Sequence, residues 1–494
     1  MDFLIRFVQQ HETFRKPETD AIADLLGVEL AWLRYTDDSP YAVVRFGNIA
    51  DPKAAARQLL RRSILGTAIY ELWGEGVDYE TLHSDTRRRS EHLWNQYRQP
   101  SFRFELDSFH GSRNKDEQRN IFESFRYMDF QGPIRMRDPD QQFVVFEESV
   151  LNGKLPHRIF CGRLVAESGR KAMNKYNLKK RKYIATTSMD AELSLVTANM
   201  AQAAPGTLAY DPFMGTGSFP VACAHFGASV FGSDLDGRSV RGKPGRNVAA
   251  NFDQYGTSAC YLGGFAADIT NTPLRNGRIL DAIICDPPYG VREGLKVLGS
   301  TRVARREVVY LADGTPAHLQ PNYVAPKKPY SFLRMMDDIL DFAYDRLVDG
   351  GRLCMWVPVA GSAEGVEPPD TTTDGQAPSG DSIAPERLYK VAEDDVPRHP
   401  GLRLVSHCRQ DFNKWSRRLL TYARRKDGEG DSEALLAYKT QRLTLAAEGD
   451  APGSKATADD LNEFRKRYFL GFKGPAASKE GAEMEAEASA KNDG

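Results

Sequence analysis

Residues 211–218, Asp-Pro-Phe-Met-Gly-Thr-Gly-Ser, and residues 286–289, Asp-Pro-Pro-Tyr, decide the fold of this chain. Short apolar runs, residues 207–210 and 282–285, precede the two motifs and predict buried strands. An open α/β sheet builds its ligand crevice from loops at the carboxyl ends of parallel strands. The two motifs therefore predict one ligand site at one edge of a sheet.

The chain from residue 189 onward alternates apolar runs of strand length with helical periodicity. Strands are expected at 207–210, 229–232, 261–264, 281–285 and 352–357, and helices at 190–201, 219–226, 237–255 and 332–347. This alternation predicts a doubly wound parallel sheet of the Rossmann-like α/β class. Two inserts interrupt it: residues 361–384 lack periodicity and predict disorder, and residues 292–329 predict a flap.

The front half predicts two smaller α/β units. Residues 1–80 follow a β-α-β-α-β rhythm typical of a ferredoxin-like domain, and residues 81–165 propose a second unit. A basic linker is expected over 166–189, the catalytic domain over 190–472 and a disordered tail over 473–494.

Composition sets limits on the class of protein. A chain of 494 residues exceeds the usual reach of one core, and its net charge of −1 requires any nucleic-acid surface to be local. The six cysteines contain no C-x-x-C pair, so we expect neither a structural zinc site nor a disulfide framework. Scattered cysteines of this kind fit a reducing, cytoplasmic location. No apolar run is long enough for a membrane span, and no signal-peptide layout is present.

The first motif and its downstream acids fit S-adenosylmethionine. Gly215 and Gly217 allow backbone to approach a ligand, because they lack Cβ. Asp211 suits the ammonium of the amino-acid tail, Asp234 the ribose hydroxyls and Asp268 the adenine amine. The flanking residues assigned to the same site are Pro212, Phe213 and Leu235.

Two other interpretations of this loop are open. A nicotinamide-binding fingerprint would need a third glycine where Pro220 stands, so that fingerprint is broken. The strand-end acids can also be solvated residues of ordinary turns.

The second motif predicts chemistry on an exocyclic amine. Such an amine is a poor nucleophile because its lone pair is delocalised into the ring. The ionised Asp286 carboxylate and the Pro287 carbonyl can accept the amine protons, and Pro288 keeps the turn rigid. Tyr289 offers a face on which a flipped-out base can stack. The alternative is a proline pair that only ends a strand.

These motifs resemble the amino-methyltransferases with an [Asn/Asp]-Pro-Pro-Tyr loop. Residues 182–194 and 199–201, with Tyr468-Phe469, make the chain similar to the catalytic subunits of the eukaryotic tRNA guanine-10 N2-methyltransferase family. The resemblance implies methyl transfer to guanine N2 in tRNA, a THUMP RNA-binding domain in the front half, and Thr187 and Ser188 beside the cofactor. It also implies a small zinc-binding activator subunit as partner, with no metal on this chain.

Residues 170–182 hold seven basic residues and no acid. With the resemblance, they predict contacts to tRNA phosphates, although a solvated connector or a nuclear signal would have the same composition. The residues assigned to RNA binding are Lys171, Lys175, Lys179, Lys180, Arg181 and Arg292.

Rival functions remain open from the residues alone. A DNA adenine or cytosine amino-methyltransferase uses the same two loops, and a protein-glutamine methyltransferase usually carries Asn where Asp286 stands. A non-catalytic tRNA-binding scaffold is the alternative outside the enzymes, but both motifs are intact.

Overall fold

The computed structural model describes residues 1–47, 49–151, 153, 155–291, 294–300, 308–320, 323–360, 396–412, 415–449, 462 and 464. The expected insert 361–384, the tail 473–494, Tyr468-Phe469 and Arg292 lie outside these residues. The chain forms two compact units. The first holds residues 1–209, 215–231 and 241–263, and the second holds 210–214, 232–240 and 264–494.

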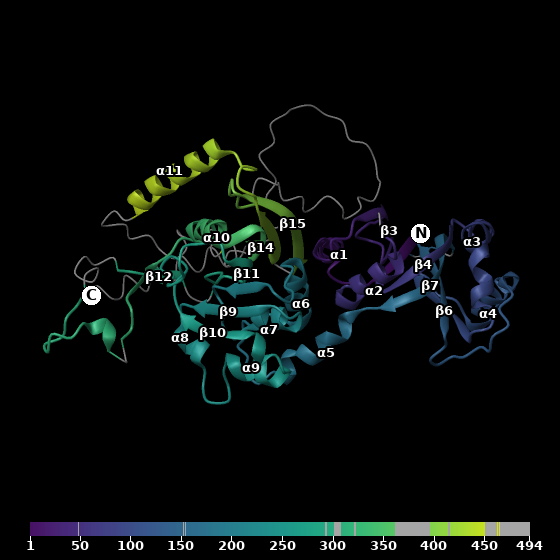
Figure 1. Ribbon diagram of the computed structural model, residues 1–494, viewed down its shortest axis with the longest axis horizontal. Coiled ribbons are helices and arrows are strands. Elements are labelled where there is room, and N and C mark those ends of the chain that lie inside the picture. The colour runs from purple at the N-terminus through teal and green to yellow at the C-terminus, as the bar shows by residue number, and fades with distance from the viewer. Residues whose placement is uncertain are drawn as a thin grey trace, which may run out of the picture. The chain divides into compact units, whose positions relative to one another are not determined.

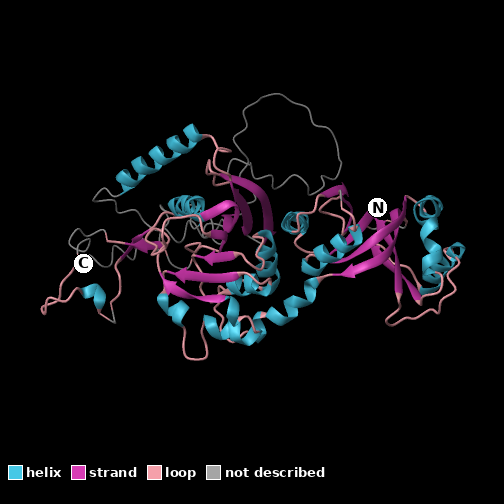
Figure 2. Cartoon of the chain, in the orientation of Figure 1, coloured by secondary structure: helices cyan, strands magenta, loops and turns pink. Residues whose placement is uncertain are grey.

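A seven-stranded sheet organises the N-terminal part, in the order β2-β3-β1-β4-β7-β6-β5. Figure 1 labels β3, β4, β6 and β7 of this sheet, and Figure 2 shows its strands in magenta. Its strands are β1 (Asp2–Phe7), β2 (Leu30–Arg34), β3 (Tyr41–Phe46), β4 (Gly66–Gly76), β5 (Phe102–Phe109), β6 (Gln141–Ser149) and β7 (Pro156–Glu167). Strands β4 and β7 pair antiparallel, so strands from both sides of the domain boundary expected at residue 80 belong to one sheet. The sequence predicts strands of this part at 3–8, 42–46, 68–73, 101–106 and 143–147, so β2 and β7 have no counterpart among them.

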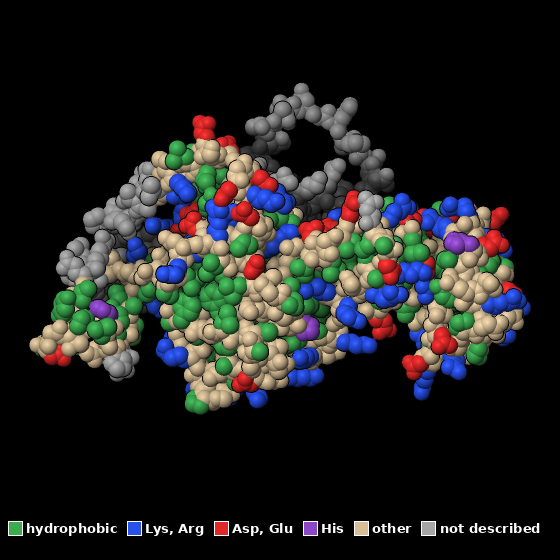
Figure 3. Space-filling view, viewed as in Figure 1, with side chains coloured by type: hydrophobic (Ala, Val, Ile, Leu, Met, Phe, Trp, Pro, Cys, Tyr) green, Lys and Arg blue, Asp and Glu red, His purple; other side chains and the backbone are tan. Residues whose placement is uncertain are grey.

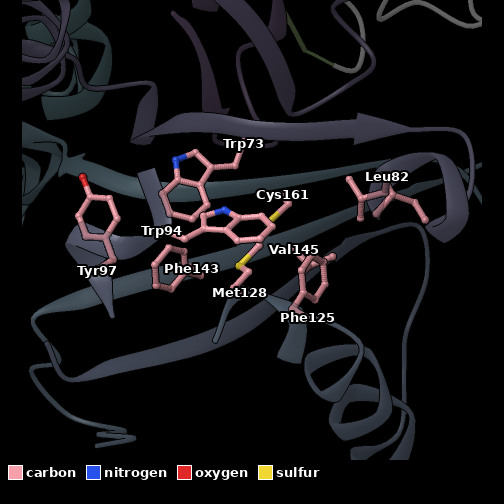
Figure 4. Close-up of a cluster of buried hydrophobic side chains, with 10 residues drawn as sticks. Trp73, Leu82, Trp94, Tyr97, Phe125, Met128, Phe143, Val145 and Cys161 are labelled. Atoms are coloured by element: carbon pink, nitrogen blue, oxygen red, sulfur yellow. The ribbon is translucent and has the colours of Figure 1, made fainter. Parts of the chain in front are cut away.

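Four helices accompany this sheet: α1 (Glu12–Leu25), α2 (Pro52–Arg62), α3 (Tyr79–Trp94) and α4 (Lys115–Glu123). Both α3 and α4 begin with a capping box, at Asp78 and Asn114, which satisfies two backbone N–H groups at each start. Figure 4 shows the aromatic core associated with α3, in which the Trp73 and Phe143 rings lie 5.0 Å apart. Trp73 and Phe143 are almost fully buried, so their packing stabilises this part mainly through removal of apolar surface from water.

The second sheet has the order β10-β9-β8-β11-β14-β16-β15. Its strands are β8 (Leu208–Asp211), β9 (Ser229–Asp234), β10 (Tyr261–Ala266), β11 (Leu280–Cys285), β14 (Leu347–Ala360), β15 (Leu402–Asp411) and β16 (Trp415–Arg424). β11 and β14 are parallel, whereas β16 is antiparallel to both β14 and β15. The expectation of an all-parallel sheet is therefore wrong at this end. The reason is local: three residues connect β15 to β16, and so short a link permits only a hairpin.

The helices of this half are α5 (Ala172–Tyr176), α6 (Ala191–Met200), α7 (Ser218–His225), α8 (Gly237–Arg241), α9 (Val248–Tyr255), α10 (Phe332–Arg346) and α11 (Ser432–Gly449). The single helix expected over 237–255 is split into α8 and α9. Gly242 and Gly245, with φ of 57° and 70°, adopt left-handed backbone in the gap, and Pro244 lies between them. Within the described residues, no helix is long and apolar enough to cross a membrane.

The base of the expected flap is an antiparallel pair, β12 (Lys296–Leu298) with β13 (Lys327–Pro329). Leu295 and Val297 are buried, and Tyr330 N–H donates to the Leu295 carbonyl at 2.9 Å. The two ends of the flap are therefore held together by packing and by hydrogen bonds.

Candidate active site

Three carboxylates of the second unit lie at the carboxyl ends of neighbouring strands. Asp211 and Asp234 are the last residues of β8 and β9, and Asp286 directly follows β11. Asp211 is 3% exposed, and its Oδ1 accepts a 2.9 Å hydrogen bond from the Phe213 N–H. Burial raises the pKa of Asp211 well above its usual range, and the charges of Asp234 and Asp286 raise it further. Clustered acids of this kind favour a cationic ligand, because a nearby positive charge stabilises the ionised form of Asp211 against both its burial and the repulsion from the other two carboxylates.

The backbone of residues 211–214 is fixed to the end of β9. Met214 N–H donates to the Ser233 carbonyl at 2.8 Å, and the Tyr210 and Ser233 hydroxyls are 2.6 Å apart. A Cβ at Gly232 would lie 2.8 Å from the Asp211 carbonyl oxygen and 2.7 Å from Met214 Sδ, so only glycine allows this approach. Gly232, Ser233 and Met214 support the site, although Met214 has no role in the sequence-based assignment and Gly232 and Ser233 lie outside the two motifs.

The glycine loop lies in the first unit. Gly217 has a φ of 84°, and a Cβ there would lie 2.9 Å from Val248 Cγ1, so the turn into α7 requires glycine. The Ser188 and Thr216 hydroxyls are 2.8 Å apart, and Asn251 Nδ2 donates to the Thr216 carbonyl at 3.2 Å. The structure thus places Ser188 against this loop, whereas Thr187 is exposed.

Asp234 and Asp268 both stabilise turns at strand ends. Asp234 Oδ1 accepts from the Asp236 N–H at 2.8 Å, across Leu235. Asp268 Oδ1 accepts from the Thr270 N–H and hydroxyl at 2.8 and 2.9 Å, and its Oδ2 accepts from the Leu298 N–H at 2.8 Å. Since a carboxylate has about four acceptor positions, these bonds leave Asp268 capacity for about one more. Its bond to β12 also joins the expected flap to the strand end.

Asp286 and Tyr289 form the centre of the second motif. The Tyr289 hydroxyl donates to Asp286 Oδ1, and Arg417 Nη1 lies 4.0 Å from Asp286 Oδ2. Burial raises the pKa of Asp286 to about 6, although Tyr289 and Arg417 oppose the rise. Burial and the Asp286 charge raise the pKa of Tyr289 far above its usual range, so its hydroxyl stays protonated and donates.

Aromatic side chains surround Tyr289. Its ring centroid lies 6.0 Å from that of Trp415 and 6.3 Å from that of Phe464, both in edge-on arrangements. Asn462 Nδ2 donates to the Tyr289 carbonyl at 2.9 Å. Because Trp415, Asn462 and Phe464 lie more than 120 residues beyond the motif, no local pattern in the sequence could have assigned them to it.

The expected RNA-contact residues have different surroundings. Lys171, Lys175, Lys179 and Lys180 are exposed. Arg181 is only 5% exposed: its guanidinium donates to the Ser218 hydroxyl at 3.0 Å and the Tyr255 hydroxyl at 3.3 Å. Arg181 is therefore used inside the protein, at the start of α7, and is not available to RNA. On the face shown in Figure 3, Lys and Arg side chains of the N-terminal part are interspersed with Asp and Glu.

Several other arginines of the front half are also committed to protein contacts. Arg89 bridges Asp2, Asp85 and Glu75 at 2.7–3.1 Å. Arg62 donates to the Ala203 carbonyl and lies 4.1 Å from the Phe226 ring centroid. In the described residues, no group of three or more His, Cys, Asp or Glu side chains is arranged to hold a metal ion.

Comparison with known proteins agrees with these two halves. Residues 1–170 match the model of the Tmrp11 THUMP N-terminal domain, and residues 179–299 match that of the RMKL-like methyltransferase domain. The chain is 41% identical to the tRNA (guanine(10)-N(2))-methyltransferase of Saccharomyces cerevisiae, over 95% of this chain and 99% of that protein. The chain belongs to the tRNA (guanine(10)-N(2))-methyltransferase family.

Other relatives extend the comparison. The chain is 35% identical to the Schizosaccharomyces pombe protein of the same name, over 94% of this chain and 96% of that protein. Among solved structures, TrmN from Thermus thermophilus aligns with 86% of this chain and all of its own, at 15% identity and a TM-score of 0.40. Family membership confirms the resemblance inferred from the motifs and the Rossmann-like methyltransferase class of the catalytic half.

Proposed function

We propose that this chain transfers a methyl group from S-adenosylmethionine to the exocyclic N2 of a guanine at position 10 of tRNA. The observation that carries the proposal is the set of strand-end carboxylates Asp211, Asp234 and Asp286, in a member of a family whose relatives are named for this reaction. Burial and the charges of its acidic neighbours raise the pKa of Asp211. A ligand with a sulfonium and an ammonium group complements such a site, because its positive charges stabilise the ionised carboxylates.

Asp211, Pro212, Phe213, Gly215 and Gly217 would hold the amino-acid end of the cofactor, with Thr187 and Ser188 beside it. Asp234 and Leu235 would hold the ribose, and the remaining acceptor position of Asp268 would serve the adenine amine. When bound, S-adenosylmethionine supplies an electrophilic methyl group.

Asp286 and the Pro287 carbonyl would accept the N2 protons, which releases the lone pair for attack. As the new N–C bond forms, the sulfur–methyl bond of the donor would break and leave a neutral thioether. One N2 proton would pass to Asp286, whose pKa of about 6 leaves it ionised at neutral pH. Pro288 keeps this turn rigid, and Tyr289 orients the carboxylate through its hydroxyl and limits the space for the base.

Residues 1–165 would recognise the shape and backbone of tRNA, and Lys171, Lys175, Lys179 and Lys180 would contact phosphates. Structured RNA is bound chiefly through such contacts. Arg292 remains a candidate for the same role. We place the reaction in the cytoplasm.

A small zinc-binding subunit is the proposed partner. Strands β10 and β15 form the edges of the second sheet, and Leu262 and Leu404 on them are 61% and 41% exposed. Edge strands with exposed apolar side chains favour pairing with another chain.

Mass spectrometry of nucleosides tests the function directly. Unmodified tRNA incubated with the full-length chain, its partner and a labelled methyl donor should yield N2-methylguanosine, and the Asp286→Ala variant should not form it. Label on adenine or cytosine of duplex DNA would instead identify the DNA enzyme. Binding of tRNA without methyl transfer would identify a scaffold.

A further inference from the structure

Arg417 on β16 is a side chain that the reaction described above does not use. Its Nε donates to Gln410 Oε1 at 2.6 Å, and its guanidinium lies 4.6 Å from the Trp356 ring centroid and 5.6 Å from that of Phe412. The side chain is 14% exposed. Arg417 also hydrogen-bonds the Tyr289 side chain. Hydrogen bonds to Gln410 and Tyr289 and two aromatic faces therefore fix the plane of the guanidinium before any substrate binds.

The fixed guanidinium lies beside the catalytic loop. Arg417 Nη1 is 4.0 Å from Asp286 Oδ2, which is close enough for attraction but too far for a hydrogen bond. The charge of Arg417 lowers the pKa of Asp286 without overcoming the effect of burial. An acceptor and a donor thus stand side by side, with a gap between them.

This gap matches one base edge better than the others. On guanine the amine N2 and the carbonyl O6 are separated by N1–H, so two donors and then an acceptor occur in a row. On adenine the acceptor N1 directly adjoins the carbon that bears the amine, and no carbonyl follows it. Cytosine has a carbonyl at the same span as guanine, but its middle atom is the acceptor N3, which would face the Asp286 carboxylate without a proton to donate. A separation of 4.0 Å between Asp286 Oδ2 and Arg417 Nη1 leaves room for the intervening N1–H of guanine.

We propose that Arg417 donates a hydrogen bond to guanine O6 while Asp286 accepts from the amine, so that Arg417 determines specificity for guanine. The proposal rests on the proposed function and deepens it, because it assigns base selection to one side chain. Single-stranded or splayed bases in RNA are recognised by hydrogen bonds to this same edge.

The test compares two acceptors at the target position of tRNA, guanine and 2,6-diaminopurine. Diaminopurine keeps the N2 amine but carries an amino group in place of O6, so it offers Arg417 a donor. Full-length wild-type protein should prefer guanine in kcat/KM by about 5- to 150-fold, the range for one good base contact. Arg417→Gln should lower kcat/KM on guanine and reduce the preference to about threefold or less.

Matched variants separate base recognition from an effect on Asp286. Arg417→Lys keeps the positive charge but loses the planar fork, so it should retain the pH profile and still lose most of the preference. Arg403→Gln on β15, an exposed arginine, should keep the full preference. Melting curves of each variant confirm folding.

An equal loss on both acceptors, with an unchanged preference for guanine and a shifted pH profile, would overturn the proposal and leave Arg417 as a positioning residue for Asp286. Failure of the wild-type protein to methylate guanine would overturn the proposed function itself. The two failures are therefore distinguishable.

Discussion

Asn199 Nδ2 donates a buried 2.7 Å hydrogen bond to Glu18 Oε1, which joins α6 to α1 across 181 residues of sequence. The same carboxylate accepts from the Ser63 hydroxyl and from the N–H groups of Ile64 and Leu65, at 2.9–3.1 Å. Burial nevertheless raises the pKa of Glu18. The first helix of the catalytic half thus belongs to the same compact unit as the N-terminal sheet.

We expect Glu18→Ala to lower the free energy of unfolding by at least about 3 kcal/mol, because four buried donors lose their acceptor and each costs roughly 1–3 kcal/mol. Urea unfolding measures the change. A double-mutant cycle with Asn199→Ala should show a coupling of at least about 0.5 kcal/mol. Glu91→Ala, at an exposed position of α3, is the control and should change stability by less than about 0.5 kcal/mol. Strict additivity in the cycle would contradict the role given to the pair.

Binding of the methyl donor should depend on Asp234. We expect Asp234→Ala to weaken S-adenosylmethionine binding by about 1–3 kcal/mol, since the ribose hydroxyls lose their acceptor. Isothermal calorimetry measures the affinity, with Asp253→Ala on the exposed side of α9 as the control. Tight NAD binding without affinity for the methyl donor would disprove the cofactor assignment.

Turnover should follow the ionisation of Asp286. Because its pKa is about 6 and the ionised form acts, kcat should be level above about pH 7 and fall about tenfold per unit well below pH 6. Asp286→Asn should lose about 10²- to 10³-fold in kcat at neutral pH. A rate profile of the wild-type protein from pH 5 to 8 provides the measurement. Near-normal turnover of Asp286→Asn on tRNA would exclude this residue as the base.

The same pKa shift has a consequence for stability. Between the unfolded value near 3.8 and the folded value of about 6, the folded chain binds more protons at Asp286 than the unfolded chain does. The contribution of Asp286 to stability therefore falls as pH rises through this window, and it remains unfavourable at pH 7. Asp286→Asn should accordingly unfold at a higher urea concentration than the wild-type protein at pH 7, and an unchanged midpoint would count against the shift.

Salt dependence can test the linker lysines. A quadruple variant carries alanine in place of Lys171, Lys175, Lys179 and Lys180. It should bind tRNA more weakly, and the slope of log K against log salt should be smaller by up to about 3–4. Each phosphate that a lysine no longer neutralises accounts for roughly 0.9 of that slope. Filter binding over 50–200 mM salt, a range in which such slopes are resolved, gives the measurement. Lys16→Ala is the control, because Lys16 pairs with Asp20 at 2.6 Å on α1. An unchanged slope in the quadruple variant would assign these lysines to a solvated surface.

The proposed partner should raise the melting temperature of the chain, since any ligand of the folded state stabilises it by mass action. Thermal melts with increasing partner measure the effect. Leu262→Glu and Leu404→Glu identify the edge strand involved, because only the variant on that strand should lose the response. If the monomer fraction from size-exclusion chromatography is fully active without the partner, the requirement for a partner is refuted.

Local patterns predict most elements of the catalytic half. Four strands and the helices α6, α7 and α10 lie within about two residues of the expected ranges, because apolar runs and caps act over short distances, whereas β14 is much longer than the strand expected at 352–357. Strand β7 is not predicted, and the polar start of its sequence (Pro156-His157-Arg158) explains why: pairing with β4 and β6, rather than local hydrophobicity, makes it a strand. The prediction that Arg181 contacts RNA is wrong for a related reason. Its basic neighbours in the sequence indicate an exposed surface, whereas hydrogen bonds to Ser218 and Tyr255 hold it inside the protein.

The sequence by itself determined the two motifs, their order and the strands before them, because glycine, proline and aspartate impose their backbone and charge wherever they stand. Only the tertiary structure decided what surrounds Asp286. Arg417 and Trp415 contact that loop because β16 pairs antiparallel with β14, and Asn462 contacts it from still further along the chain. All three lie more than 120 residues beyond the motif. Contacts between residues so far apart in the sequence depend on which strand pairs with β14, and a short stretch of sequence does not determine that pairing.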